Sequence, residues 1–272
     1  MVRPRKVFAQ HWLKSEKALA EIIQAAKLEQ GDRILEIGPG TGILTRRILP
    51  LVQSLVAVEI DRDLCEHLAK ELGKRENFLL LQGDFLELDV PSLLEGYPAF
   101  QNPNKVVANI PYNITGPIIE KILGTIANPN PELYDLIVLL VQKEVAERLV
   151  AKPGSKACGA LTVRVQYLAE CELISIVPAK AFYPPPKVDS AVVQLIPRKI
   201  EPAAQDPRKL ETLVKLGFAA KRKMLRNNLQ SVVKRDRLTQ LLEQLEVNPQ
   251  ARAEELSIGQ WVALSNQLEV NS

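Results

Sequence analysis

Short apolar runs alternate with amphipathic stretches along the first half of the chain, and this alternation constrains the fold more than any other feature. The apolar runs are four to six residues long, rich in branched side chains and bounded by turn residues, which is typical of buried strands. The stretches between them have helical spacing; at 61–72, for example, Leu64, Leu68 and Leu72 recur on one face. The pattern predicts an α/β protein with a mostly parallel sheet. The predicted strands are 33–37, 55–59, 78–82, 105–109 and 136–141.

The second half of the chain changes character. Helices are expected around 143–151 and 159–169, and two further strands at 172–178 and 190–197 could pair antiparallel at the sheet edge. The segment 197–209 has three prolines and mixed charge, which indicates a linker, and 208–272 is helical in pattern. We therefore expect a large domain at 1–200, beginning with a basic arm at 1–14, and a small helical domain at 201–272.

The composition is that of an ordinary globular protein. The net charge of +3 is too small to indicate a nucleic-acid partner by itself. Three cysteines without a CxxC pair, and only two histidines, favour neither disulfides nor a metal site and suggest a reducing compartment. No apolar run is long enough for a membrane helix, and the N-terminus lacks the apolar core of a signal peptide. We expect a cytoplasmic protein that does not bind membranes.

Polar residues and glycines stand at the ends of four predicted strands. The stretch "EIGPGTGILT" puts Gly38, Gly40 and Gly42 at a strand-to-helix junction, where the backbone can approach a ligand closely. Glu59 is placed to accept both hydroxyls of a ribose, and Asp84 to accept from an exocyclic amine. Because the sixth position of the turn is Ile43, the pyrophosphate fingerprint is incomplete. Unless each residue is only a separate turn or cap, the arrangement favours a nucleoside without phosphates.

The stretch "NIPY" at 109–112 ends the fourth strand, and it is either a simple strand-ending turn or a base-binding motif. With the features above, it resembles the adenine-N6 motif of Rossmann-like S-adenosylmethionine-dependent methyltransferases, although Ile110 replaces their proline. The resemblance implies that the Asn109 side chain and the Ile110 carbonyl accept from the adenine amine, while Tyr112 stacks on the base. Such chemistry requires neither a metal nor a general base.

Further motifs are spread over the whole chain. In order, they are "RKVFAQHWL" (5–13), "EIGPGTGILT" (36–45), "VEIDRDL" (58–64), "GDFLELD" (83–89), "NIPYNIT" (109–115), "VQKEVAERLVA" (141–151), "AFYPPPKVDSAVV" (181–193) and "FAAKRKMLRNNL" (218–229). In this order they resemble the motifs of the ribosomal RNA small-subunit adenine-N6 dimethyltransferase family. The resemblance implies S-adenosylmethionine-dependent dimethylation of two adjacent adenosines in the 3′-terminal hairpin of small-subunit ribosomal RNA, with a role in small-subunit biogenesis. The partners would be that RNA or the pre-ribosomal small subunit.

Two of these motifs add site residues. In "FYPPPKVDS", Phe182 is either a hydrophobic anchor or, as the resemblance implies, a second stacking face opposite Tyr112. In "AQHWL", His11 and Leu13 would contact the cofactor. The family usually has Gly-Gln-Asn-Phe-Leu there, so His11 replaces an asparagine, and an arm residue without contacts is the alternative.

Charge is concentrated between Lys215 and Arg237, where eight lysines and arginines face one acid on a predicted helix. Arg222, Lys223 and Arg226 are candidate RNA phosphate contacts, and a solvated helix face is the alternative. Three other functions remain open: a macrolide-resistance methyltransferase acting on large-subunit RNA, a non-catalytic assembly or RNA-binding factor, and a small-molecule methyltransferase. We expect a monomer.

Overall fold

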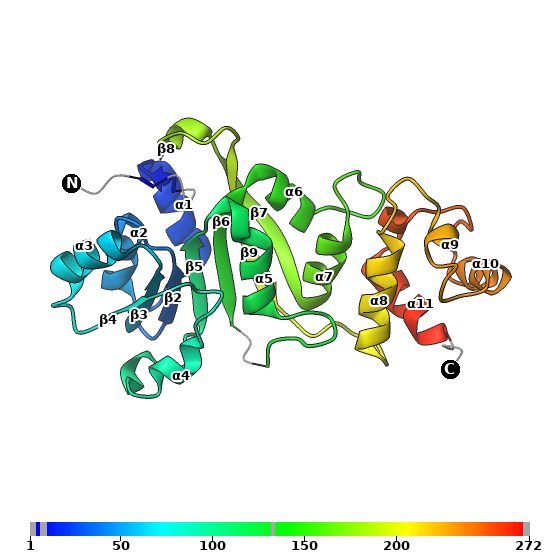
Figure 1. Ribbon diagram of the computed structural model, residues 1–272, viewed down its shortest axis with the longest axis horizontal. Helices are drawn as coiled ribbons and strands as arrows, with labels where there is room; N and C mark the ends of the chain where they lie inside the picture. Colours follow the sequence, from blue (N-terminus) through cyan, green and yellow to red (C-terminus); the bar gives the residue numbers. More distant parts are fainter. Residues whose placement is uncertain (1–3, 6–9, 132–133, 269–272) are drawn as a thin grey trace. The chain divides into compact units, whose positions relative to one another are not determined.

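A seven-stranded sheet is the centre of the computed structural model, which describes residues 4–5, 10–131 and 134–268. The strand order is β4-β3-β2-β5-β6-β9-β7 (Figure 1). Neighbours from β4 to β6 run parallel, and β9 is antiparallel to β6, so the predicted mostly parallel sheet is confirmed. The strands are β2 (Arg33–Ile37), β3 (Ser54–Glu59), β4 (Phe78–Gln82), β5 (Lys105–Asn109), β6 (Leu136–Gln142), β7 (Ala169–Val177) and β9 (Ser190–Pro197).

The predicted strands agree with these bounds to within a residue over the first five. The two later strands are neighbours as expected, with β7 at the sheet edge and β9 between β7 and β6. A separate two-stranded ribbon, which the sequence did not indicate, joins β1 (Trp12–Leu13) to β8 (Phe182–Tyr183). This ribbon pairs the start of the chain with a segment far along it.

Helices connect the strands, and their ends follow local sequence. In α1 (Glu16–Ala26), the Ser15 side chain caps the first turn by accepting from the Ala18 N–H, and in α3 (Arg62–Leu72) the Asp61 side chain accepts from the Asp63 N–H. Short 3₁₀ turns add η2 (Leu49–Leu51), η3 (Pro98–Phe100), η4 (Tyr112–Ile114), η5 (Ala179–Ala181) and η6 (Ala253–Glu255). The α-helices are α1 (Glu16–Ala26), α2 (Ile43–Ile48), α3 (Arg62–Leu72), α4 (Val90–Leu94), α5 (Thr115–Leu123), α6 (Lys143–Leu149), α7 (Ala160–Leu168), α8 (Pro207–Gly217), α9 (Leu225–Asn228), α10 (Arg235–Gln244) and α11 (Ile258–Gln267).

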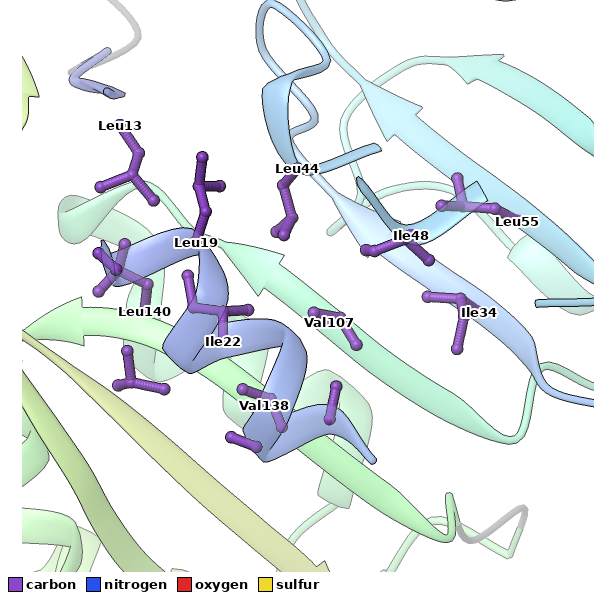
Figure 2. Packing of buried hydrophobic residues seen from close by; sticks show 14 of the residues in the cluster. Leu13, Leu19, Ile22, Ile34, Leu44, Ile48, Leu55, Val107, Val138 and Leu140 are labelled. Atoms are coloured by element: carbon purple, nitrogen blue, oxygen red, sulfur yellow. The ribbon is translucent and has the colours of Figure 1, made fainter. Parts of the chain in front are cut away.

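The main core lies between the sheet and α1. Figure 2 shows Leu19 and Ile22 of α1 next to Val107 of β5 and to Val138 and Leu140 of β6. All five side chains are fully buried. Burial of a large aliphatic side chain contributes roughly 1.5–3 kcal/mol, so this contact holds the first helix firmly on the sheet.

The chain divides into two compact units. The sheet unit comprises Met1–Ile122, Glu132–Ala146 and Glu172–Pro197, and the helical unit comprises Leu123–Pro131, Glu147–Cys171 and Arg198–Ser272. The helical unit therefore takes in α7 as well as α8–α11, so the division is not a single cut at residue 200. The reason is packing, because α7 contacts α8 and α11. Among the described residues, no helix combines the length and the apolar character needed to cross a membrane.

The basic stretch from Lys215 to Arg237 is not the continuous helix that its pattern predicted. Helix α8 ends at Gly217, and only the short α9 follows before α10 begins. The side-chain amide of Asn228 donates to the carbonyls of Gly217 and Ala220, which satisfies the end of α8 and the turn after it. A side chain from downstream thus ends a helix that the local spacing would have continued.

Candidate functional site

A cavity of about 220 Å³ opens at the carboxyl ends of the parallel strands. Its walls come from the residues that follow β2, β3, β4 and β5, where ligands bind in open α/β sheets. All the residues predicted to bind the nucleoside line this cavity: His11, Leu13, Gly38, Gly40, Glu59, Asp84 and Asn109.

The glycine turn forms the first wall. Gly38 and Gly40 have φ of +68° and +57°, in the left-handed region that other residues rarely adopt. A Cβ on Gly38 would lie 3.9 Å from the Asn109 carbonyl oxygen and from Pro111, so the turn lies directly against "NIPY". The backbone of the turn is therefore exposed to the cavity without side chains between them.

Glu59 is the last residue of β3, and its carboxylate is held by main-chain donors. One oxygen accepts from the Gly40 N–H at 3.1 Å and the other from the Asp61 N–H at 3.0 Å. Burial raises the pKa of Glu59, while these two hydrogen bonds act in the opposite direction. Each oxygen has a second lone pair, so the oriented carboxylate can still accept two ribose hydroxyls.

Asp84 and Ile60 form the next part of the wall. One oxygen of Asp84 accepts from the Leu86 N–H at 2.9 Å, which fixes the carboxylate after β4 and leaves its other oxygen for a ligand amine. Ile60 lines the cavity although 44% of it is exposed, and the sequence analysis missed it. Its position directly after Glu59, the acid predicted to bind ribose, was the available signal, because an exposed apolar side chain there can cover the face of a base.

The "NIPY" segment follows β5 and lies beside the glycine turn. Asn109 is half-buried at the end of β5, Ile110 is buried, and Tyr112 begins the short turn η4. The three predicted residues Asn109, Ile110 and Tyr112 all line the cavity. The Tyr112 hydroxyl is hydrogen-bonded to Ser190 at 2.6 Å. The structure thus brings a side-chain amide and an aromatic ring to the same cavity as the glycine turn.

The start of the chain also reaches the cavity. His11 stacks on Tyr112, with ring centroids 5.8 Å apart and planes 18° from parallel. Its Nδ1 lies 2.7 Å from the Pro184 carbonyl oxygen, so that nitrogen carries the donating hydrogen. His11 therefore has defined contacts, with an aromatic ring as well as with the cavity, and the alternative of an arm residue without contacts is wrong.

The described residues of the basic arm form ion pairs and hydrogen bonds with acidic side chains. Arg5 pairs with Asp61 at 3.3 Å and with Asp63, while the Gln10 amide donates to Asp61 at 3.1 Å. Residues 1–3 and 6–9, which include Arg3 and Lys6, lie outside the described residues. The charge of Arg5 is thus partly neutralised within the protein.

Phe182 does not lie in the cavity. It pairs with Leu13 in the β1–β8 ribbon, is only 1% exposed and belongs to the main core. Because side chains alternate along a strand, its neighbour Tyr183 points outward and is 60% exposed. In this structure Phe182 is a hydrophobic anchor, and the aromatic ring that faces Tyr112 is His11.

Glu36 is a cavity residue that the sequence analysis did not single out. It is 1% exposed in β2, and one of its carboxylate oxygens has no hydrogen-bond partner among the described residues. Burial raises the pKa of Glu36 to about 8, and the nearby Glu59 carboxylate acts in the same direction. Glu36 had no separate signal in the sequence, because it lies inside an apolar strand and is the first residue of the glycine-turn motif.

The predicted RNA contacts belong to the helical unit, whereas every cavity residue belongs to the sheet unit. Arg222 and Lys223 are exposed, but Arg226 is half-buried and its Nε is enclosed without a hydrogen-bond partner in the described structure. Within the described ranges, no group of three or more His, Cys, Asp or Glu side chains could hold a metal ion.

Taken together, the cavity fits a nucleoside that carries no phosphate. It offers carboxylates for hydroxyls and an amine, apolar faces for a base, and a glycine backbone for close approach. Among the described residues that line it there is neither Lys nor Arg, the side chains that a phosphate would favour.

Comparison with known proteins assigns this cavity to a family. The family model described as ribosomal RNA adenine dimethylase matches residues 1–269. The chain is 76% identical over 278 residues to ribosomal RNA small subunit methyltransferase A of Nostoc punctiforme, covering 100% of this chain and 97% of that protein. It is 65% identical over 272 residues to the protein of the same name from Rippkaea orientalis, covering 100% of both.

Solved structures agree. A dimethyladenosine transferase from Plasmodium falciparum is 27% identical, with a TM-score of 0.76 over 93% of this chain and 96% of that one. The 23S rRNA methyltransferase ErmE is 28% identical, with a TM-score of 0.73 over 93% and 98%. The glycine turn, the strand-end acids and "NIPY" are thus found in one cavity of a chain that matches along nearly its whole length, and the chain belongs to the ribosomal RNA adenine dimethylase family.

Proposed function

We propose that this protein transfers methyl groups from S-adenosylmethionine to N6 of adenosines in small-subunit ribosomal RNA, forming dimethyladenosine. The observation that carries the proposal is that Asn109 and Tyr112 share one cavity with the glycine turn and Glu59. S-adenosylmethionine supplies an activated methyl group when it is bound. The protein then has to hold that nucleoside and present the target adenine to it.

Glu59, Asp84 and Ile60 would hold the nucleoside. The two oxygens of Glu59, already oriented by the Gly40 and Asp61 N–H groups, accept the ribose hydroxyls. Asp84 accepts from the adenine amine, and Ile60 covers the face of the ring. Gly38 and Gly40 let the backbone approach the rest of the molecule closely.

Asn109, Ile110 and Tyr112 would present the target base. The Asn109 side chain and the Ile110 main-chain carbonyl accept from the N6 amine of the target adenine, which draws the nitrogen lone pair out of conjugation with the ring. Tyr112 stacks on the base after it leaves its helix, as extruded bases are usually held. Orientation and fixed dipoles then carry the acceleration.

The substrate is the finer part of the proposal. We place the methyl groups on two adjacent adenosines of the 3′-terminal hairpin, with the naked RNA or the pre-ribosomal small subunit as partner and a role in its biogenesis. The enzyme would act as a monomer in the cytoplasm, and exposed Arg222 and Lys223 of the helical unit would contact phosphates. Identity supports the small subunit: 76% to a small subunit methyltransferase against 28% to the 23S rRNA methyltransferase ErmE.

Mass analysis of ribosomal RNA fragments tests this proposal. The protein is incubated with methyl-labelled S-adenosylmethionine and with unmodified small-subunit RNA, large-subunit RNA or small-subunit particles. The expected result is two dimethyladenosines in one small-subunit fragment and no label in large-subunit RNA. Label in large-subunit RNA alone would move the macrolide-resistance function to the front, and no label in any of the three would favour an assembly factor without catalysis.

A further inference from the structure

The segment that carries Tyr112 does little to fix the position of its ring. Tyr112 lies on the three-residue turn η4, which has no buried residue. The turn is closed only by long hydrogen bonds, from the Ile114 N–H to the Pro111 carbonyl at 3.3 Å and from the Thr115 hydroxyl to the carbonyls of Pro111 and Tyr112 at 3.4 and 3.3 Å. A tyrosine at such a position can change its side-chain rotamer unless something outside the turn holds it.

Ser190 is well suited to hold it. It is the first residue of β9, is fully buried, and pairs with Gln142 of β6 in the antiparallel register. The neighbouring Asp189 is fixed as well, since its carbonyl accepts from Lys143 and its carboxylate from the Ala179 N–H, both at 3.0 Å. The Ser190 hydroxyl therefore projects from a point of the sheet that several hydrogen bonds hold in place.

The contact between the two residues is short and largely enclosed. Tyr112 Oη and Ser190 Oγ are 2.6 Å apart, at the short end for two hydroxyls. Burial raises the pKa of the Tyr112 hydroxyl, so the group stays protonated near neutral pH and can donate or accept. On its face the ring meets His11, and at its tip it meets Ser190. Two contacts from different parts of the chain thus define one ring orientation.

We propose that Ser190 is a positioning residue for the methyl transfer, which holds the Tyr112 ring in the orientation that receives the target adenine. The proposal rests on the function proposed above. It links the segments "NIPYNIT" and "FYPPPKVDS" although 78 residues separate the two side chains, because the first would supply the stacking face and the second would fix it. Ser190 does not line the cavity, so its effect on the reaction passes through Tyr112.

A double-mutant cycle tests the assignment, with Ser190→Ala, Tyr112→Phe and the double variant. Single-turnover methylation is measured at saturating RNA and S-adenosylmethionine, and cofactor affinity is measured by calorimetry. Each single variant should slow methyl transfer about 5- to 50-fold, since each removes the same buried hydrogen bond. The double variant should be no slower than the slower single one, and cofactor affinity should stay within about twofold, because Glu59 and Asp84 are untouched.

Ser175→Ala is the matched control. It removes another serine hydroxyl of the same sheet unit, one that bonds to Glu21 at 2.8 Å, and should leave the rate unchanged. A normal rate in Ser190→Ala, or rate losses that simply multiply in the double variant, would overturn the proposal. If Ser190→Ala fails to fold, Tyr112→Phe tests the proposal alone, because it deletes the same Tyr112–Ser190 hydrogen bond from the partly exposed side chain. A normal rate of methyl transfer in Tyr112→Phe would then overturn the proposal. Lack of methylation by the wild-type protein would instead count against the proposed function itself.

Discussion

At the scale of single residues, Asn109 separates chemistry from binding. It ends β5, and its main-chain carbonyl lies beside the glycine turn, whereas main-chain donors fix Glu59 and Asp84, the residues proposed to hold the nucleoside, independently of it. An acceptor aimed at an amine gains most in the transition state, where the nitrogen begins to share its lone pair and its N–H groups become stronger donors.

Replacing Asn109 with Ala should therefore slow methyl transfer by roughly 10²–10³, as when one preorganised partner of developing charge is lost. Cofactor affinity should fall much less. Single-turnover rates and calorimetry on the same preparation check both expectations. Asn109→Asp retains a side-chain acceptor and should lose far less rate. Near-normal turnover in Asn109→Ala would mean that "NIPY" is a strand-ending turn.

A second prediction at this scale concerns Glu36 and the pH dependence of the free energy of unfolding. Its usual pKa is 4.5, whereas burial raises the pKa of Glu36 to about 8 in the folded protein. Between these values the folded state keeps the proton and the unfolded state releases it. The contribution of Glu36 to the free energy of unfolding is thus at its full value below pH 4.5 and is lost as the pH rises to about 8.

In Glu36→Gln this dependence disappears, because glutamine cannot ionise. The variant should lose less stability than the wild type between pH 5 and pH 8, with a difference on the order of a few kcal/mol. Urea unfolding of the cofactor-free protein at several pH values measures it. Glu87→Gln, which removes an exposed carboxyl, is the control. Parallel pH profiles for the wild type and Glu36→Gln would show that Glu36 is already ionised in the folded state.

At the scale of elements, a buried ion pair fastens the amino ends of the strands, opposite the end that carries the cavity. Lys105 of β5 donates to Asp32, just before β2, at 2.7 Å and to the carbonyl of Lys27, at the end of α1, at 2.6 Å. Burial alone would raise the pKa of Asp32, but hydrogen bonds from Lys105, Asn104 and the Glu29 N–H together lower it. The carboxylate is therefore charged and depends on its partners.

Lys105→Ala should destabilise the fold by about 3–5 kcal/mol, because it leaves a buried carboxylate without its cation. Urea unfolding at neutral pH gives the value. The exposed pair Arg62–Glu66, with its atoms 2.9 Å apart on α3, is the comparison, and Arg62→Ala should cost less than about 1 kcal/mol. Equal effects of the two substitutions would contradict the assigned role of the buried pair.

At the scale of the whole molecule, binding of RNA should depend on the helical unit as well as on the cavity. Arg222 and Lys223 are exposed there and free to meet phosphates. Arg226 is half-buried with an enclosed Nε, so its replacement would disturb packing as well as charge.

The variant Arg222→Gln/Lys223→Gln therefore tests phosphate contact more cleanly than one that also changes Arg226. RNA affinity should fall, and the slope of log affinity against log salt should flatten by up to about 0.7–0.9 per lost contact. Binding measured over a range of salt concentrations checks this. Lys70→Gln/Lys74→Gln removes the same charge from exposed positions of the sheet unit and should keep the slope. Equal slopes for the wild type and the Arg222/Lys223 variant would assign these residues to a solvated surface.

The sequence by itself determined the parallel sheet and the cavity residues that stand at the strand ends. Parallel strands joined by crossover helices bring their carboxyl ends to one edge, so Gly38, Glu59, Asp84 and Asn109 had to meet once the strands were recognised. Each of these residues follows its own strand, and local spacing was enough to find them.

Contacts between distant segments were decided only by the tertiary structure. Alternation along β8 requires Phe182 and Tyr183 to point in opposite directions, but the pairing with Leu13 decides that Phe182 turns into the core. The same pairing brings His11 onto Tyr112, and the place of β9 in the sheet brings Ser190 to the Tyr112 hydroxyl. Local propensity acts over a few residues, whereas these contacts depend on which buried surfaces pack together, and burial is a property of the folded molecule.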